Sequence, residues 1–210
     1  MNTSAEPVEL IDIGANLTHD SFDEDRTEVV ERALTAGVSH FILTGSSETG
    51  SKDALALARA NPLLMRSTAG VHPHHAADYS SDVEQTLTAL LDDPLTVAVG
   101  ECGLDYFRNF SPVQAQRHAF EQQLQLAARV QKPVFLHQRD AHEDFVSILK
   151  PHLSSLPRAV AHCFTGDGNM LDTYLSMGLY IGITGWICDE RRGQHLQELV
   201  GRIPLDRLMI

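Results

Sequence analysis

Cysteine is scarce in this chain: Cys102, Cys163 and Cys188 are the only three among 210 residues. They are widely spaced and form no C-x-x-C pair. A disulfide framework and a cysteine-rich structural zinc site are therefore not expected. We interpret the three residues as small side chains that are buried or line a site in a reducing compartment.

Long apolar runs are also missing. No segment approaches the roughly 18 apolar residues that suggest a membrane-spanning helix. The first residues, MNTSAEPVEL, have neither the basic start nor the apolar stretch of a secretory signal. We therefore expect a cytoplasmic protein with no membrane partner, and we expect it to be a monomer.

Basic residues are outnumbered: 16 Lys and Arg stand against 28 Asp and Glu, for a formal net charge of −12 at pH 7. This balance argues against a general nucleic-acid coat protein, because such binding depends on Lys and Arg that neutralise phosphates. It is compatible with an enzyme that grips a few nucleotides, because a bound cation locally reverses the field. Histidine, by contrast, is abundant, with 11 residues.

Short apolar runs alternate with helical patterns, and no linker or low-complexity tract divides the chain. We therefore expect one α/β domain over residues 1–210. The runs start about 20–37 residues apart, which is the spacing of β-α units. Most are continuously apolar, which is typical of parallel strands covered by helices. The predicted strands are 9–17, 40–45, 66–72, 96–103, 133–139, 158–164, 179–185 and 207–210.

Eight such strands predict a (β/α)8 barrel of the TIM type. The alternative is an open doubly wound sheet, but the first predicted strand is followed by GANLTHD rather than by G-x-G-x-x-G. Helices are predicted over 22–37, where Gly37 ends the helix, and over 111–131. The eighth run ends at Ile210, whereas such barrels have roughly 250 residues. We therefore expect an eighth strand that is cut short and a barrel whose C-terminal part is missing.

Polar residues end four of these runs: STAGVH, VAVGE, VFLH and AVAH end at His72, Glu101, His137 and His162. The C-terminal ends of barrel strands meet at one mouth. A lone strand-end histidine is more often a core or surface residue, but the repetition favours a site. A buried Glu is costly unless it is paired or binds metal, and imidazoles with a carboxylate suit a divalent metal. Such a metal acidifies water and polarises a P–O or C–O bond.

Six segments carry a family resemblance: DIGANL (12–17), TAGVHPH (68–74), VAVGECGLDY (97–106), PVFLHQRDA (133–141), AVAHCFTG (159–166) and YIGITGWICDERRG (180–193). In this order they resemble the TatD family of metal-dependent deoxyribonucleases, within the amidohydrolase-like barrels of the metal-dependent hydrolase superfamily. The resemblance implies hydrolysis of DNA, commonly 3′→5′ on single strands, with a role in DNA degradation or repair. RNA is a further candidate substrate. Mg²⁺ is the expected ion, with Mn²⁺ or Zn²⁺ as alternatives.

The resemblance maps metal ligation onto Glu101, His137 and His162. Glu101 and His72 are the expected catalytic residues, and His72 is expected near the scissile phosphate. The further candidates for substrate binding are Asn16, Asp105 and Arg139. The guanidinium of Arg139 suits phosphate oxygens, although an ion pair with Asp140 is an equal alternative.

Other polar and aromatic residues near these strand ends have two interpretations each. Trp186 either packs under a loop or stacks on a nucleobase, and Tyr106 and Phe107 are open in the same way. The charged run 189–192 is interpreted as a solvated helix start. The remaining histidines discussed are expected at the surface: His74, His75, His118, His142, His152 and His195.

Two departures from the family pattern affect the metal site. Many members begin with D-x-H-x-H-L, whose histidines bind metal, but Gly14 and Asn16 stand at these positions here. This is similar to the TatD-proper branch, and we expect one firmly bound ion rather than two. The family also places a metal-binding Asp just after the eighth strand, in a segment like E-T-D-A-P-Y. The printed sequence ends before it, so we expect that ligand to be missing.

Two rival functions stay open. Related barrels hydrolyse amides and lactones, so a C–N or ester hydrolase acting on a small molecule is one alternative. A non-enzymatic or folding-impaired fragment is the other.

Overall fold

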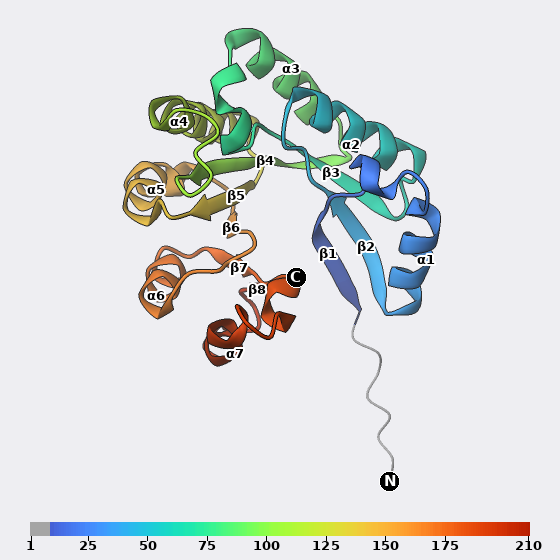
Figure 1. The fold of residues 1–210 in the computed structure, drawn as a ribbon. Coiled ribbons are helices and arrows are strands. Elements are labelled where there is room, and N and C mark those ends of the chain that lie inside the picture. The colour runs from blue at the N-terminus through green and yellow to red at the C-terminus, as the bar shows by residue number, and fades with distance from the viewer. Residues whose placement is uncertain (1–8) are drawn as a thin grey trace.

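The computed structural model describes residues 9–210, and all eight strands form one parallel sheet in sequence order, from β1 to β8 (Figure 1). The backbone N–H of Ile13 donates to the carbonyl of Ile210 at 2.9 Å, which ties the last residue to β1. The eight strands therefore form a nearly closed barrel, and the predicted (β/α)8 fold is confirmed. The strands are β1 (Leu10–Ala15), β2 (Val38–Leu43), β3 (Met65–Ala69), β4 (Thr96–Asp105), β5 (Val134–Arg139), β6 (Ala159–Ala161), β7 (Tyr180–Gly182) and β8 (Leu208–Met209).

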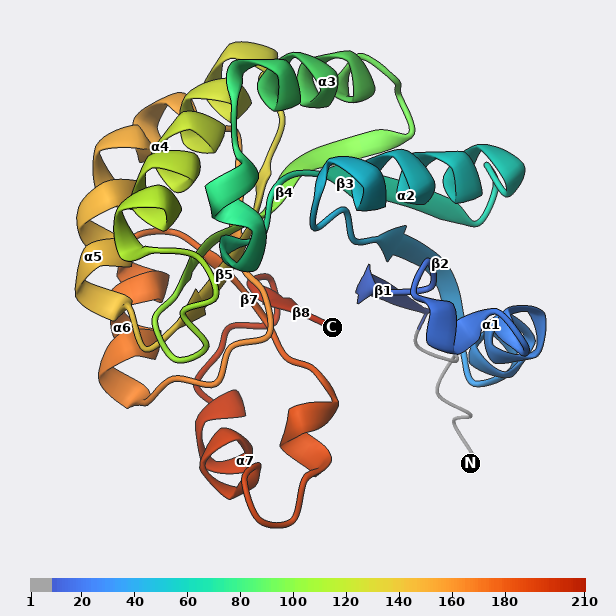
Figure 2. The same ribbon diagram turned by 45° about the horizontal axis from the view of Figure 1, so that its top comes forward.

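Helices connect the strands and cover the outside of the sheet (Figure 2). They are α1 (Arg26–Thr35), α2 (Glu48–Ala60), α3 (Ser81–Leu91), α4 (Val113–Val130), α5 (His142–Leu149), α6 (Gly168–Ser176) and α7 (Gln194–Val200). The short 3-10 helices are η1 (Asp20–Phe22), η2 (Pro73–Asp78), η3 (Lys150–Ser155) and η4 (Gly185–Cys188). Within residues 9–210, no helix combines the length and the apolar character that crossing a bilayer requires.

The helix ends follow local sequence chemistry. Ser47 caps α2, because its hydroxyl accepts the backbone N–H of Gly50 at 3.0 Å. Asp167 caps α6 by accepting the backbone N–H groups of Asn169 and Met170, each at 2.9 Å. Gly37 follows α1 with φ 101°, a conformation that favours glycine, as predicted for the end of this helix.

The larger core lies between β3–β8 and the helices that cover them. Phe120 of α4 stacks on Phe145 of α5 with ring centroids 5.4 Å apart, and Tyr174 of α6 packs against Phe145 at 5.5 Å. All three side chains are almost fully buried. A smaller cluster, which includes Phe41 and Leu43, packs under β1 and β2. These contacts hold the strand ends, and therefore the mouth of the barrel, in place.

Candidate metal centre and active site

Three candidate residues meet at the C-terminal ends of neighbouring strands. His72 follows β3, Glu101 lies in β4 and His137 lies in β5. His137 Nδ1 is 3.1 Å from Glu101 Oε1, and His72 Nε2 is 3.8 Å from the same oxygen. One donor atom from each residue lies within 4.8 Å of the other two. The Glu101 carboxylate is therefore surrounded by imidazoles in a mostly buried position.

The electrostatics of this group favour charge on Glu101. Burial raises the pKa of the Glu101 carboxyl, but the neighbouring imidazoles lower it more, so that its pKa is about 2. Burial lowers the pKa of His137, but the carboxylates of Asp105 and Glu101 raise it to about 9. Without a metal, Glu101 and His137 thus form a charged pair. A divalent cation takes the place of the proton when it binds such a histidine.

Two buried imidazole nitrogens at this mouth have no hydrogen-bond partner. They are Nε2 of His137 and Nδ1 of His162, and among the described residues only the Thr44 hydroxyl shares this condition. Buried polar atoms normally have partners, so two unpartnered imidazole nitrogens at one mouth need an explanation. The Nδ1 of His137 lies 3.1 Å from Glu101 Oε1, so a cation bound by both groups takes the place of the proton between them. The donor set therefore fits a divalent metal.

His162, which follows β6, lies apart from the three-residue group. Its ring stacks on Phe135 with centroids 4.4 Å apart and 30° between the planes. A Cβ built on Gly14 would lie 2.5 Å from Cε1 of this ring. A side chain at position 14 would therefore collide with the ring of His162 where it now lies. The ligand set of Glu101, His137 and His162 remains a prediction, with His72 as the geometric alternative to His162.

The hydrogen bonds of His72 bear on that choice. Its Nδ1 accepts the backbone N–H of His74 at 3.1 Å, so this nitrogen carries no proton. Burial lowers the pKa of His72 to about 3, and the ring is therefore neutral with its proton on Nε2. That N–H faces Glu101. A protonated nitrogen cannot bind a metal, so this arrangement favours His72 as a hydrogen-bond donor at the mouth.

His74 was expected at the surface, and this expectation is wrong. Its side chain is 28% exposed, its Nε2 lies 2.8 Å from Asp105 Oδ2, and its ring packs edge-on against His72 at 4.2 Å. The same Asp105 oxygen is 3.5 Å from Nε2 of His137. Asp105, which is 1% exposed, also accepts the backbone N–H of Arg108 at 2.8 Å. Any effect of Asp105 on substrate therefore passes through the histidines that it holds.

Of the other histidines expected at the surface, His75, His118 and His195 are exposed. His142 and His152 are half-buried instead, and His142 Nδ1 lies 3.2 Å from the hydroxyl of Tyr174. Neither of the two contacts the mouth residues described above. They pack on the helices that surround the barrel.

Two glutamines of α4 hold the backbone at the mouth of the barrel. Neither was identified from the sequence. The side-chain amide of Gln123 accepts from the backbone N–H of Val71 at 2.7 Å and donates to its carbonyl at 3.0 Å. Gln116 accepts the backbone N–H of Asp105 at 2.8 Å. Both side chains are buried. The available signal was their spacing of seven residues on the apolar face of a helix, which marks polar groups that must find partners inside.

The remaining substrate-binding candidates lie on the rim. Asn16 follows β1 and is exposed. Arg139 ends β5, and its guanidinium carbon lies 3.9 Å from the ring centroid of Phe107 rather than in an ion pair with Asp140. No carboxylate among residues 9–210 pairs with Arg139, whose guanidinium lies over the Phe107 ring, so its hydrogen-bond donors are available to a ligand.

Comparison with known proteins finds similar sequences over nearly the whole chain. A family model described as "TatD related DNase" matches residues 11–210. The protein named 3'-5' ssDNA/RNA exonuclease TatD of Erwinia tasmaniensis is 55% identical over 201 residues, which are 96% of this chain and 78% of that protein. The protein of the same name from Salmonella typhimurium is 52% identical, over 96% of this chain and 77% of that protein.

Solved structures of two TatD proteins have folds similar to that of this chain. A TatD homologue from Escherichia coli superposes with a TM-score of 0.86 at 30% identity, over 95% of this chain and 76% of that one. A hydrolase of the TatD family from Entamoeba histolytica gives a TM-score of 0.85 at 28% identity, over 97% of this chain and 73% of that one.

Proposed function

Because this chain belongs to the family of TatD-related DNases, we propose that it is a metal-dependent 3′–5′ exonuclease that hydrolyses the phosphodiester bonds of single-stranded DNA, with a role in DNA degradation or repair. The observation that carries the metal-dependent chemistry is the pair of unpartnered imidazole nitrogens, on His137 and His162, beside a buried carboxylate. The relatives whose names state a 3′–5′ exonuclease on single strands support the substrate.

Glu101, His137 and His162 are the proposed metal ligands. A divalent cation there supplies the Lewis-acid charge and the acidified water that phosphodiester hydrolysis uses. Mg²⁺ is the proposed ion because of the family resemblance, and Mn²⁺ or Zn²⁺ also suit a set of imidazoles with a carboxylate. Since raw affinity does not decide between these ions, activity must be compared across all three.

Other residues of the chain are proposed to bind and position the substrate. His72, neutral with its proton on Nε2, donates a hydrogen bond to a phosphate or leaving-group oxygen. Asp105 positions His74 and His137, whose rings flank His72. Arg139 binds a phosphate group with its guanidinium, and Asn16 offers an amide on the opposite rim.

RNA as a second substrate, a cytoplasmic location and a monomeric state belong to the same proposal. The printed names of the relatives support RNA, because they state both nucleic acids. Size-exclusion chromatography with light scattering tests the monomer, and a dimer would overturn it.

The test is degradation of single-stranded DNA labelled at either end, with Mg²⁺, Mn²⁺ or Zn²⁺ and with EDTA. We expect metal-dependent loss of the 3′ label first, and no loss in EDTA. Glu101→Gln should abolish the activity, whereas Glu121→Gln, the same change at an exposed site on α4, should not. Absence of EDTA-sensitive release would overturn the proposal, and turnover of cyclic amides or lactones instead would favour the C–N or ester hydrolase.

A further inference from the structure

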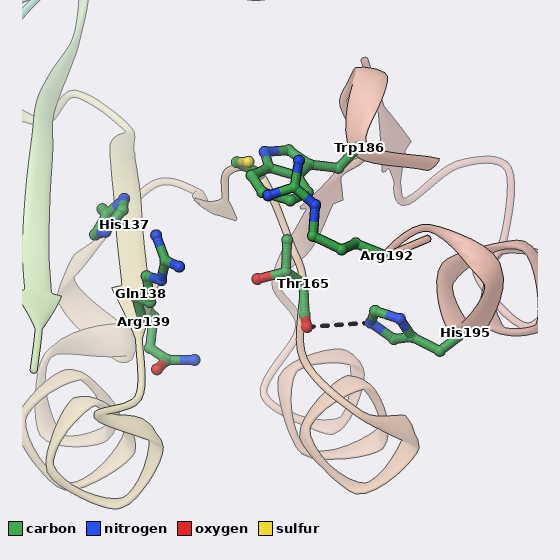
Figure 3. A pocket seen from close by; sticks show the side chains of 8 residues that line it. His137, Gln138, Arg139, Thr165, Trp186, Arg192 and His195 are labelled. Atoms are coloured by element: carbon green, nitrogen blue, oxygen red, sulfur yellow. Dashed lines mark hydrogen bonds between the residues drawn. The ribbon is translucent and has the colours of Figure 1, made fainter. Parts of the chain in front are cut away.

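A cavity of about 320 Å³ opens beside the candidate metal centre, between β5 and the segment that follows β7 (Figure 3). Its size falls in the range of about 300–1,000 Å³ that small-molecule sites have. His137 and Arg139 line one side, and Trp186, Arg192 and His195 line the other. The chain carries 28 acids against 16 bases, yet none of the eight side chains that line this cavity is acidic. The cavity is therefore suited to an anionic ligand.

One wall of the cavity is a stacked pair. The guanidinium carbon of Arg192 lies 4.1 Å from the ring centroid of Trp186, as Figure 3 shows. Asp189 holds this guanidinium through contacts of 2.7 and 3.1 Å to its Oδ2. Trp186 is half-buried against the core, and Arg192 is 58% exposed. The pair thus presents a planar surface whose orientation is set by the protein, with the guanidinium charge paired to Asp189.

The opposite wall of the cavity includes a residue of the candidate metal centre. His137, a proposed metal ligand, lines the same cavity, and so does Arg139, which is stacked on Phe107 at 3.9 Å. A second cavity of about 360 Å³ shares Gln138, Arg139 and Thr165 with the first. The two cavities therefore meet at Arg139, but Asp140 and Asp167 line the second, so only the first suits an anionic ligand.

We propose that the Trp186–Arg192 pair is the subsite that stacks an unpaired nucleobase of the substrate next to the scissile phosphate. Nucleobases stack on aromatic rings and on guanidinium planes, and a base offers its face only when it is unpaired. Arg139, which has no acidic partner among the described residues, neutralises a flanking phosphate that the net charge of the rest of the chain would otherwise repel. This subsite rests on the proposed function, and it gives that function a structural reason for preferring single strands.

Trp186 is the only tryptophan of the chain, so its fluorescence reports on this cavity alone. In EDTA, where no hydrolysis takes place, the chain is titrated with a short single-stranded oligonucleotide and with an abasic phosphodiester of equal length. We expect saturable quenching by the oligonucleotide and little or none by the abasic chain. Equal responses to both, or no response to an oligonucleotide that binds by fluorescence anisotropy, would overturn the subsite.

Variants test the same point by a second readout. Trp186→Leu and Arg192→Gln should each weaken oligonucleotide binding by about 5- to 150-fold, the range that base stacking supplies. Arg207 over Tyr180, with 5.0 Å from the guanidinium carbon to the ring centroid, is a matched pair at the other end of the barrel. Tyr180→Leu and Arg207→Gln should therefore leave binding unchanged. Arg192→Gln retains Trp186, and circular dichroism checks the fold of every variant.

The outcome separates this inference from the proposed function. If the wild type degrades DNA with metal while Trp186→Leu and Arg192→Gln bind oligonucleotide as tightly as it does, the nuclease stands and the subsite is wrong. If base-dependent quenching occurs but no metal supports hydrolysis, the subsite stands and the nuclease is wrong.

Discussion

Gly14 leaves the space that the ring of His162 fills. A Cβ at Gly14 would lie 2.5 Å from Cε1 of His162, closer than two such atoms approach in proteins. The glycine at position 14 therefore allows the ring of His162 to lie where it does in the barrel mouth. A histidine at position 14 would require His162 to move.

Gly14→Ala should therefore displace the His162 ring and weaken metal binding. The overpacking should also lower the free energy of unfolding by about 1–3 kcal/mol. Thermal denaturation and calorimetric titration with Zn²⁺ measure the two effects. Gly201→Ala is the matched control, because a Cβ there has no atom within 4 Å. Unchanged metal affinity in Gly14→Ala would contradict the role given to His162.

His72 and His162 should differ in what their loss removes. A metal at about 100 times its dissociation constant stabilises the fold by about 2.7 kcal/mol, which raises the melting temperature. His162→Asn should abolish this metal-induced rise. His72→Asn should retain the rise while turnover falls by about 10²- to 10³-fold, the range for loss of one positioned hydrogen-bond donor. Loss of the rise in His72→Asn would instead place His72 among the ligands.

Asp105→Asn should lower metal affinity and activity, because Asp105 positions His74 and His137. The amide keeps the shape but removes the charge that faces His74 and His137 at 2.8 and 3.5 Å. Loss of such a supporting carboxylate costs about 10- to 100-fold in metal affinity or activity. Asp172→Asn, which removes an exposed partner of Arg202, should have no such effect. Calorimetric titration measures the metal affinity of both variants. Equal metal affinities of Asp105→Asn and Asp172→Asn would be inconsistent with the positioning role of Asp105.

The strand positions could be predicted because parallel strands buried on both faces need continuous apolar runs. For β4, the predicted range 96–103 lies within the observed strand Thr96–Asp105. For β5, the predicted range 133–139 starts one residue before the observed strand Val134–Arg139. The prediction for β6, 158–164, extends beyond the observed Ala159–Ala161. The excess contains Cys163, whose φ of 50° cannot continue a strand. Apolar character alone does not reveal where the backbone leaves the sheet.

The site could be predicted only in part. His72, Glu101 and His137 follow or lie within apolar runs, and the structure brings them together. His74 carries no such signal, because it lies in η2 and its partner Asp105 is 31 residues away. The tautomer of His72 depends on a backbone N–H of the following turn. Long-range hydrogen bonds of this kind are properties of the fold rather than of local pattern.

Two further glycines test why β4 and β5 approach closely at the site. A Cβ at Gly103 would lie 1.9 Å from the carbonyl oxygen of His137, and the φ there is 141°. Gly178, with φ 80°, has no atom within 4 Å of such a Cβ. Gly178→Ala should therefore lose only about 1–2 kcal/mol through backbone conformation. Gly103→Ala should lose several kcal/mol more in urea denaturation, and equal losses would contradict the close approach.

The central claim is that Glu101, His137 and His162 hold the metal while His72 stands beside it as a donor. Crystals grown with Zn²⁺, whose anomalous scattering locates the ion, test this most directly. We predict an anomalous peak about 2.0–2.2 Å from the Glu101 carboxylate and from ring nitrogens of His137 and His162. A peak bound to Nε2 of His72 instead of to His162, or no peak at the barrel mouth, would contradict the account.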